Sequence, residues 1–215
     1  MSAITGVMQD YLKAIYKLQQ GRDAVSTSEI AERLGVSAAS ATNMVKRLAR
    51  LRLVAYSRYQ GFALTPAGER IALEIIRHHR LIELYLAQHL GVPLDQVHGE
   101  AERMEHVLSD EVEARMATAL GNPVQDPHGD PIPSMDGTMR DVRYPKLDTL
   151  APGALGVVAH VSDQRPALLR RLAGLGVLPG VVLKMLGRRR NGCEVEIEGR
   201  RLMLSRTLSR TVRVQ

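Results

Sequence analysis

The pattern of apolar and polar positions changes twice along this chain of 215 residues. Up to about residue 120, apolar side chains mostly recur at helical spacing. From about residue 147 they alternate in short runs, as they do in β-strands. The segment between them, GNPVQDPHGDPIPSMDG, is dense in Gly and Pro, which predicts an irregular linker over residues 123–146. We therefore expect a mainly α-helical protein that ends in a small β-barrel over residues 147–215.

The N-terminal part of the chain has the pattern of a helix-turn-helix followed by a hairpin. The segment MQDYLKAIYKL (residues 8–18) predicts an amphipathic helix. The segment STSEIAERLGVSAASATNMVKRL (residues 26–48) predicts two short helices about a turn at Gly35. The run LVAYSRYQGFALT (residues 53–65) alternates like a hairpin. Together these elements predict a winged helix-turn-helix, a DNA-binding domain, over residues 1–65.

The second helix of a helix-turn-helix places its first residues against base edges in the major groove. Ser37 is expected to cap this helix, and Thr27 or Ser28 the helix before it. The expected DNA contacts are small or polar residues at its start, basic residues further along and two wing residues: Ser37, Ala39, Ser40, Thr42, Asn43, Lys46, Arg47, Arg50, Arg58 and Tyr59. The alternatives are ordinary solvated charges or a protein–protein module, because winged helices serve both purposes.

Two long helices are expected in the middle of the chain. Thr65 and Pro66 form a helix-start signal, and the helix that they open is predicted to run to about Leu90. A second long helix is predicted from about Leu94 to Leu120. We take residues 66–122 as one helical domain.

Charge follows the same division. Residues 1–70 carry a net charge of +5, residues 71–147 of −6 and residues 148–215 of +7, within a total of +6. The basic segments favour binding to a polyanion, whereas the acidic middle segment favours binding of cations. No apolar run approaches the roughly 20 residues that a membrane span needs. The single cysteine, Cys193, suits a reducing cytoplasm and is expected to pack within a strand.

The acidic middle gathers groups that can bind a metal. Residues three or four apart share one side of a helix. That spacing relates two histidines and two glutamates of the second long helix, and a histidine–glutamate pair of the first: His98, Glu102, Glu105, His106, His79 and Glu83. His78 and His89 fall off this stripe and are expected in solvent. The spacing favours a metal site with nitrogen and oxygen donors.

Other interpretations remain open at this point. A single His–Glu pair four residues apart is usually a surface hydrogen bond. A winged-helix regulator could instead respond to an organic ligand, with histidines that are merely structural. A metalloenzyme or a metal-storage protein is a further alternative. The zinc-protease pattern H-E-x-x-H is absent, and no general base stands beside the ligand set, so we expect no enzyme.

Several stretches together resemble a known family. They are DYLKAIY, IAERLGVSAASATNMVKRL, LTPAGERIA, HRLIELYL, VHGEAERMEHVLSDEVE and DPHGDPIP. Over essentially its full length, the chain resembles the DtxR/MntR family of metal-dependent transcriptional repressors. The resemblance implies a cytoplasmic homodimer that binds a pseudo-palindromic operator in double-stranded DNA. It also implies that the C-terminal domain is SH3-like, of the FeoA-like kind.

The resemblance further implies two neighbouring metal positions in each chain. By the family motif, one position uses Asp10, Glu102, Glu105 and His106. The other uses His79, Glu83 and His98. Asp10 would come from the first helix and would tie the DNA-binding domain to the metal.

Departures from the family pattern bear on which metal is sensed. Iron-responsive members carry methionine and cysteine where this chain has Asp10 and Glu102, and hard oxygen donors suit Mn²⁺ better than thiolate does. We therefore expect a repressor of metal-homeostasis genes that is activated by Mn²⁺, with Fe²⁺ as the alternative. Lys13 stands where the manganese branch typically has a glutamate. In the barrel, Arg165 and Leu168 stand where other members lend ligands. Asp163 and Gln164 lie close by, and Asp163 is the candidate ligand of the two.

Overall fold

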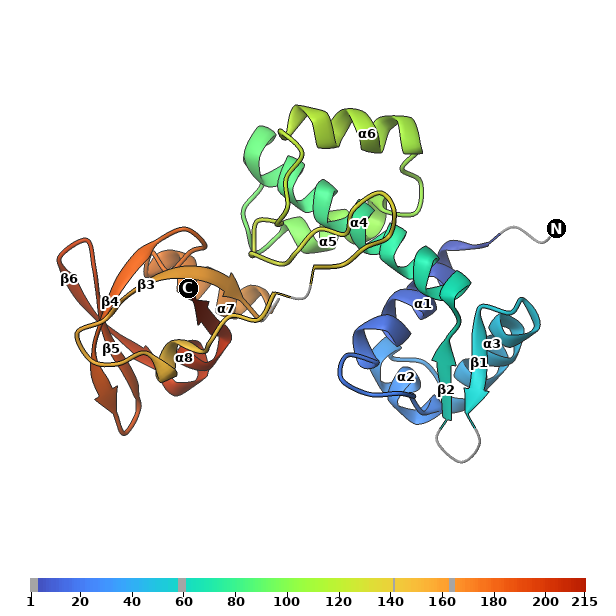
Figure 1. The fold of residues 1–215 in the computed structure, drawn as a ribbon, viewed down its shortest axis with the longest axis horizontal. Coiled ribbons are helices and arrows are strands. Elements are labelled where there is room, and N and C mark those ends of the chain that lie inside the picture. The colour runs from blue at the N-terminus through green and yellow to red at the C-terminus, as the bar shows by residue number, and fades with distance from the viewer. Residues whose placement is uncertain (1–3, 58–60, 141, 163–164) are drawn as a thin grey trace. The chain divides into compact units, whose positions relative to one another are not determined.

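The computed structural model describes residues 4–57, 61–140, 142–162 and 165–215. The chain divides into two compact units, shown together in Figure 1. One unit comprises Met1–His78 with Pro133–Met139, and the other comprises His79–Ile132 with Arg140–Gln215. Each unit is described by itself. No helix in the described ranges has the length and apolar character needed to cross a membrane.

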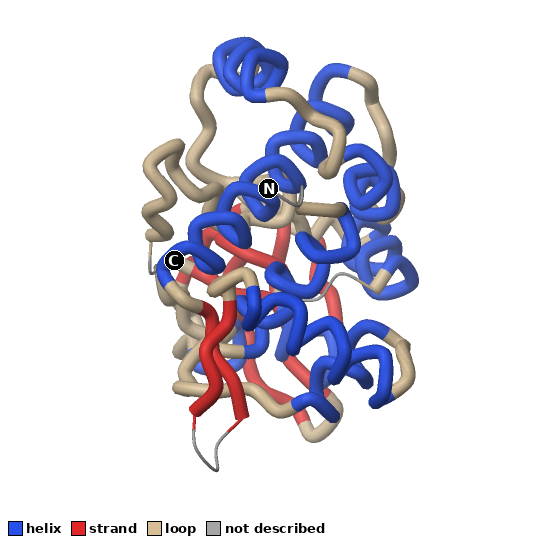
Figure 2. The backbone as a smooth tube through the Cα atoms, turned by 90° about the vertical axis from the view of Figure 1, so that its right-hand side faces the viewer, coloured by secondary structure: helices blue, strands red, loops and turns tan. Residues whose placement is uncertain are grey.

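The first unit is a winged helix-turn-helix, as predicted. Its elements are α1 (Gly6–Leu18), α2 (Thr27–Leu34), α3 (Ala38–Arg50), β1 (Val54–Ser57), β2 (Gly61–Leu64) and the start of α4 (Pro66–His89). The strands β1 and β2 pair antiparallel, and Figure 2 shows them side by side as a narrow hairpin. The core under these elements is fully buried and includes Leu12 and Ile15 of α1, Val45 and Leu48 of α3, and Phe62 of β2.

The turn between α2 and α3 follows from local capping. Gly35 has the left-handed backbone (φ 65°) that ends α2, and Ser37 caps α3 by accepting a hydrogen bond from Ser40 N at 3.2 Å. The prediction that Thr27 or Ser28 caps α2 is wrong, because the cap is Ser26. Its hydroxyl accepts from Glu29 N (3.3 Å), and the Glu29 carboxylate accepts from Ser26 N (2.8 Å), which forms a capping box.

In the second unit, the expected long helix from Leu94 to Leu120 is instead two helices, α5 (Val97–Met104) and α6 (Asp110–Ala119). The break has a local cause. Ser109 accepts a hydrogen bond from Val112 N, and acidic residues fill the first turn of α6, which is a strong helix-start signal. Two small apolar clusters hold these helices against α4: Leu81 and Leu84 pack with Ala117, and Ile82 packs with Val97.

The Gly/Pro-rich segment is irregular, as expected, but it is packed against both parts of the second unit. The Oδ1 atom of Asp126 accepts hydrogen bonds from His128 N (2.8 Å) and Asp130 N (2.9 Å) and so shapes a tight turn. The carbonyl of His128 accepts a bond from Val161 N (2.9 Å) in the C-terminal domain. Gly129 lies so close to Ala159 O that a Cβ atom would stand 2.0 Å from it, so this approach requires glycine.

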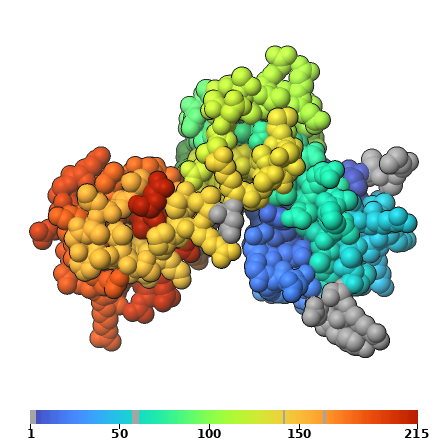
Figure 3. Space-filling model, viewed as in Figure 1, coloured from blue at the N-terminus to red at the C-terminus, as the bar shows by residue number. Residues whose placement is uncertain are grey.

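The C-terminal domain is an open antiparallel sheet. Its elements are η1 (Leu147–Thr149), β3 (Leu155–Val161), α7 (Pro166–Gly174), β4 (Val182–Arg189), β5 (Gly192–Ile197), β6 (Arg200–Ser205), α8 (Arg206–Thr211) and β7 (Val212–Val214). The strand order is β6-β5-β4-β3-β7, and Cys193 is buried in its core as expected. The β4–β5 hairpin, orange in Figure 3, projects from the domain.

The predicted barrel is therefore not closed. In the residues that the structure describes, the edge strands β6 and β7 do not pair with each other. A physical reason lies in the chain between them. Ser205 caps α8 directly after β6, so the backbone turns into a helix before the short strand β7 begins.

The assignment of Ser26 as the cap of α2 can be tested by substitution. Ser26→Ala removes the cap of α2 and is expected to lower the free energy of unfolding by about 1 kcal/mol. The neighbouring substitution Ser28→Ala is the matched control, because Ser28 is exposed at the start of the same helix. Urea unfolding of both variants in chelator measures the difference. Equal stability of the two variants would contradict the capping assignment.

Candidate metal centre

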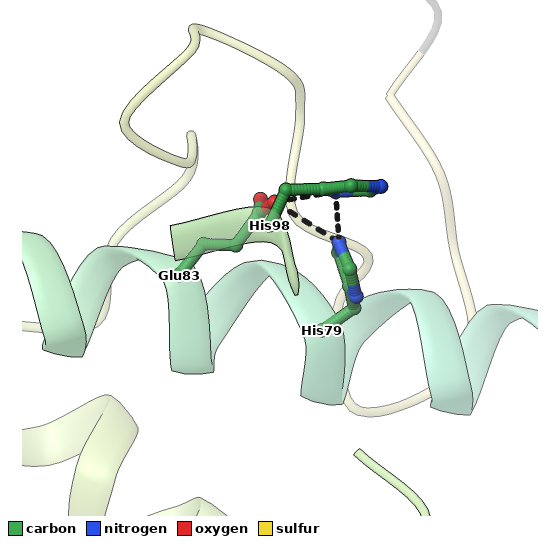
Figure 4. Close-up of side chains that lie close together, drawn as sticks. All are labelled: His79, Glu83 and His98. Atoms are coloured by element: carbon green, nitrogen blue, oxygen red, sulfur yellow. Dashed lines mark hydrogen bonds and ion pairs between the residues drawn. The ribbon is translucent and has the colours of Figure 1, made fainter. Parts of the chain in front are cut away.

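Three side chains converge in the helical part of the second unit. His79 and Glu83 stand one turn apart on α4, and His98 reaches them from α5 (Figure 4). The Oε1 atom of Glu83 lies 3.0 Å from His79 Nε2 and 3.0 Å from His98 Nδ1, and the two nitrogens lie 2.9 Å apart. The structure thus brings together the three residues that the sequence analysis grouped in one metal position.

Hydrogen bonding alone cannot satisfy all three contacts. Each ring nitrogen carries at most one proton. If both protons point at Glu83, the 2.9 Å contact between the two nitrogens has no proton. If one proton points at the other ring, one of the two contacts to the carboxylate has none. A cation at the centre serves all three atoms. At bond lengths of about 2.1 Å, ligands at right angles around one ion lie about 3.0 Å apart, which matches the observed separations.

The electrostatics of this cluster depend on burial. Glu83 is fully buried, and burial by itself raises the pKa of a carboxyl group. Contacts with His128, His79 and His98 outweigh that effect and hold the pKa of Glu83 well below its ordinary value. Glu102 and Glu83 in turn raise the pKa of His98 to about 9. At neutral pH without metal, His98 therefore carries a proton that a metal must displace.

Glu105 and His106 lie in the turn after α5 rather than on a helical stripe, because α5 ends at Met104. The buried Glu105 places Oε2 2.5 Å from His79 Nδ1, so it contacts the ring nitrogen that faces away from Glu83. A carboxylate at this position fixes the orientation of a ligating imidazole. His106 Nε2 lies 3.5 Å from Glu105 Oε1, and Glu102 Oε1 lies 3.4 Å from His98 Nε2.

The other expected metal residues are placed as follows. Asp10 and Lys13 lie on α1 in the first unit, with Lys13 buried. The joining of Asp10 to Glu105 and His106 remains a prediction. Asp163 lies outside the described residues. His89 is exposed, as expected, whereas His78 is buried, so the prediction that His78 is solvated is wrong.

Two residues beside this cluster were not predicted from the sequence. Asp126 and His128 come from the Gly/Pro-rich segment and are buried, with His128 Nδ1 3.7 Å from the second carboxylate oxygen of Glu83. Burial, together with Asp130 and Glu83, raises the pKa of Asp126. Burial opposes protonation of His128, but contact with Glu83 raises its pKa overall. The motif PHGDP was the available signal, but it was interpreted only as part of the linker and of the family resemblance, and no ligand was predicted from it.

The expected DNA-reading residues lie on α3 in the first unit. Seven are exposed: Ser37, Ala39, Ser40, Asn43, Lys46, Arg47 and Arg50. The hydroxyl of Thr42 donates to Ala38 O (2.7 Å), and Ser37 serves as the helix cap. A shallow hollow between α3 and β1 is lined by Asn43, Lys46, Ala49, Arg50 and Tyr56. Tyr56 is an exposed aromatic residue that sequence analysis missed, whereas Arg58 and Tyr59 lie outside the described residues.

Comparisons with protein families cover nearly the whole chain. Residues 3–62 match the N-terminal DNA-binding domain of iron-dependent repressors. Residues 65–134 match the metal-binding and dimerisation domain of the same proteins. Residues 146–215 match the FeoA domain.

Similar individual proteins agree with these matches. The iron-dependent repressor IdeR of Mycobacterium leprae is 33% identical, over 83% of each chain. The diphtheria toxin repressor of Corynebacterium diphtheriae is also 33% identical, over 77% of this chain and 71% of that protein. A manganese-dependent transcriptional repressor solved in complex with manganese is 39% identical, with a TM-score of 0.87 over 97% of this chain and 99% of that chain. The manganese regulator SloR superposes with a TM-score of 0.73 at 29% identity, over 100% and 99%.

The fold and these matches define a metal-dependent transcriptional repressor with DNA-binding and dimerisation domains, not an enzyme. The chain belongs to the DtxR/IdeR family of iron- and manganese-dependent repressors.

Proposed function

We propose that Mn²⁺ is the activating metal of this repressor, with Fe²⁺ as the alternative, and that it controls metal-homeostasis genes in the cytoplasm. The single observation that carries a metal role is the convergence of His79, Glu83 and His98 at separations of 2.9–3.0 Å. DNA-binding and dimerisation domains support a homodimer on operator DNA. A two-fold dimer would require a pseudo-palindromic operator.

The donor set supports manganese over iron. The residues proposed as ligands supply only imidazole nitrogens and carboxylate oxygens, and the single cysteine is buried in the C-terminal sheet. Oxygen-rich sites suit Mn²⁺, whereas thiolates favour softer metals. The similarity to a repressor solved with manganese points the same way, whereas the IdeR of Mycobacterium leprae is named an iron-dependent repressor.

We assign His79, Glu83 and His98 to one metal position, and Asp10, Glu102, Glu105 and His106 to the other. Asp163 remains a candidate ligand from the C-terminal domain. The bound metal would neutralise carboxylates that otherwise repel each other. Asp10 is the one ligand that the DNA-binding unit would contribute, so its role is to fix α1 and the helices that follow it for DNA binding.

The amount by which bound metal can raise the affinity for operator DNA is limited. A metal can strengthen DNA binding only by its difference in affinity for the two arrangements of the protein. Allosteric couplings are typically about 1–3 kcal/mol, or about 5–150-fold in affinity.

The proposed function is tested by fluorescence anisotropy of the chain on its own upstream DNA at fixed salt. We expect Mn²⁺ to tighten binding about 5–150-fold over chelator. Mg²⁺, which prefers an all-oxygen octahedral shell, is expected to have no such effect. Glu102→Ala should abolish the response to Mn²⁺. Equal binding in chelator and metal would instead favour a regulator gated by an organic ligand, and a stronger response to anaerobic Fe²⁺ would favour the iron alternative.

Asp10→Ala tests the tether separately. The variant should still bind metal at His79, Glu83 and His98, because these ligands lie in the other unit. Its operator affinity should no longer rise with Mn²⁺. Titration calorimetry measures metal binding and anisotropy measures DNA binding in the same preparation. A variant that keeps the full metal-dependent rise in operator affinity would contradict the role assigned to Asp10.

Asn43→Ala and Lys46→Ala test the DNA-reading surface as a pair. Both residues are exposed on α3 and line the same hollow. Loss of a base-reading amide should reduce discrimination between operator and mutated operator by about 1–3 kcal/mol. Loss of a phosphate-contacting lysine should weaken binding to all sequences alike and reduce the salt slope by about 1. Affinity measured at several salt concentrations on both DNAs separates the two effects, and identical behaviour of the variants would contradict the assignment.

A further inference from the structure

The C-terminal domain carries a positive charge that neither the winged helix nor the proposed metal ligands account for. Residues 148–215 hold twelve basic residues against five acidic ones. Eleven of the twelve are arginines, and only Lys184 is a lysine. After Glu198 the chain has five arginines and no Asp or Glu. The guanidinium group is the side-chain cation that best matches phosphate oxygens, through pairs of parallel hydrogen bonds, so this composition favours a polyanion that carries phosphate.

Three of these arginines gather at one end of the sheet, around the turn between β4 and β5. The turn is Arg190 and Asn191, because Arg189 pairs with Gly192 across it. The backbone N–H of Arg206, the first residue of α8, donates to Asn191 O at 2.8 Å. Figure 3 shows the hairpin projecting from the domain. We call Arg188, Arg190 and Arg206, all of which are exposed, the arginine end of the sheet.

Backbone carbonyls hold two of these guanidinium groups in place. Arg188 donates through Nε to Asp148 O and through Nη2 to Leu150 O. Arg206 donates through Nη2 to Arg190 O at 2.8 Å. A guanidinium group has five N–H donors, so most donors of both side chains remain available to another partner. A side chain that is already held loses less conformational entropy when it binds that partner.

Carboxylates do not neutralise the arginine end. Arg189 is paired with Glu194 at 2.6 Å and adds little net charge. Asp148 is a second acidic residue close by, since its charge and that of Arg188 both act on the pKa of Cys193. In the part of the chain that the structure describes, no carboxylate forms an ion pair with any of the three arginines of this end. The surface potential here is therefore positive and attracts anions.

The opposite end of the same strands is different. The turn between β5 and β6 also carries two exposed arginines, Arg200 and Arg201. There, however, Arg201 lies across from Glu196 in the strand register, and Glu198 lies in the turn itself. Opposite charges directly across two strands stabilise one another. Positive charge without a matching carboxylate is thus concentrated at the arginine end rather than spread evenly over the domain.

We propose that Arg188, Arg190 and Arg206 bind the phosphate backbone of double-stranded DNA, as a second contact in addition to the winged helix. DNA is the polyanion that the observations favour, because residues 3–62 match a DNA-binding domain. A duplex held by that domain offers phosphates to the rest of the chain at a high effective concentration. The inference goes beyond the proposed function, since it requires no metal and no contact with base edges.

Such a contact has a defined consequence for the repressor. Phosphate contacts carry no sequence information of their own, so the arginine end raises the affinity for every DNA sequence by the same factor. It leaves the ratio between operator and other DNA unchanged. Contacts of this kind also let a protein slide along DNA, so they act during the search for an operator, whether or not metal is bound.

The double variant Arg190→Gln/Arg206→Gln tests this contact in the full chain. Arg200→Gln/Arg201→Gln is the matched control, because both variants lose two arginines of the same domain and keep the same net charge as each other. Fluorescence anisotropy gives the affinity for the upstream DNA and for a shuffled duplex of equal length. Each titration is made at several salt concentrations, in chelator and in Mn²⁺.

We expect Arg190→Gln/Arg206→Gln to weaken binding to both duplexes by the same factor, with and without metal. Each lost phosphate contact should lower the slope of log affinity against log salt by about 0.9, so two should lower it by about 1.8 per bound chain. The control should keep the slope of the unaltered protein. Hydrogen exchange gives a second readout: duplex DNA should protect residues 187–192 of the unaltered protein.

Arg190→Gln alone serves if the double variant fails to fold. Its backbone carbonyl can still accept from Arg206, and we expect a slope that is lower by about 0.9 per bound chain. An equal loss of slope in the control would overturn the proposed site, because the effect would then follow net charge alone. Unchanged slopes, or the absence of exchange protection, would also overturn it. An unaltered protein whose operator binding ignores metal would instead contradict the proposed function and leave the comparison of slopes intact.

Discussion

The buried carboxylate of Glu83 is the constraint on which the proposed metal centre depends. Transfer of an ionised carboxylate from water into a protein interior is strongly unfavourable unless hydrogen bonds and opposite charges compensate. Here the compensation comes from His79 on the same helix, His98 on the next helix and His128 in the irregular segment. One charge thus constrains how two separate segments, α5 and the irregular segment, pack around α4.

Those compensating groups are also the proton-binding groups of the centre. The carboxylates raise the pKa of His98 and of His128, so without metal the cluster is neutralised by protons. A metal ion bound at the proposed ligands His79, Glu83 and His98 would replace the proton of His98 with a more concentrated charge. The same side chains therefore serve both states, and the difference between the states lies in how firmly the ligands are held. Such a difference is what a metal-responsive regulator needs, since only differential affinity can shift its conformation.

The winged helix was predictable because its signals are local: Gly35 ends α2, Ser37 caps α3, and the apolar spacing identifies the buried faces. The grouping of His79 with Glu83 was predictable because helical spacing relates the two residues on one helix. The break between α5 and α6 was missed although Ser109 signals it, since apolar periodicity continues across it. Asp126 and His128 could not be found by periodicity, because their position depends on an irregular turn and on long-range bonds to β3.

The buried polar atoms around Glu83 that have no hydrogen-bond partner also affect the free energy of unfolding. Groups arranged for a ligand rather than for one another make the ligand-free state less stable than a fully hydrogen-bonded core would be. Ligand binding to the native state adds RT ln(1 + [L]/Kd) to the free energy of unfolding, about 2.7 kcal/mol at a hundredfold excess over Kd. Metal binding would then stabilise the helices α4 and α5 most, because these helices carry the proposed ligands His79, Glu83 and His98. Structural stability and metal sensing would therefore depend on the same few side chains, which leaves little freedom to improve the packing of this region without weakening its response.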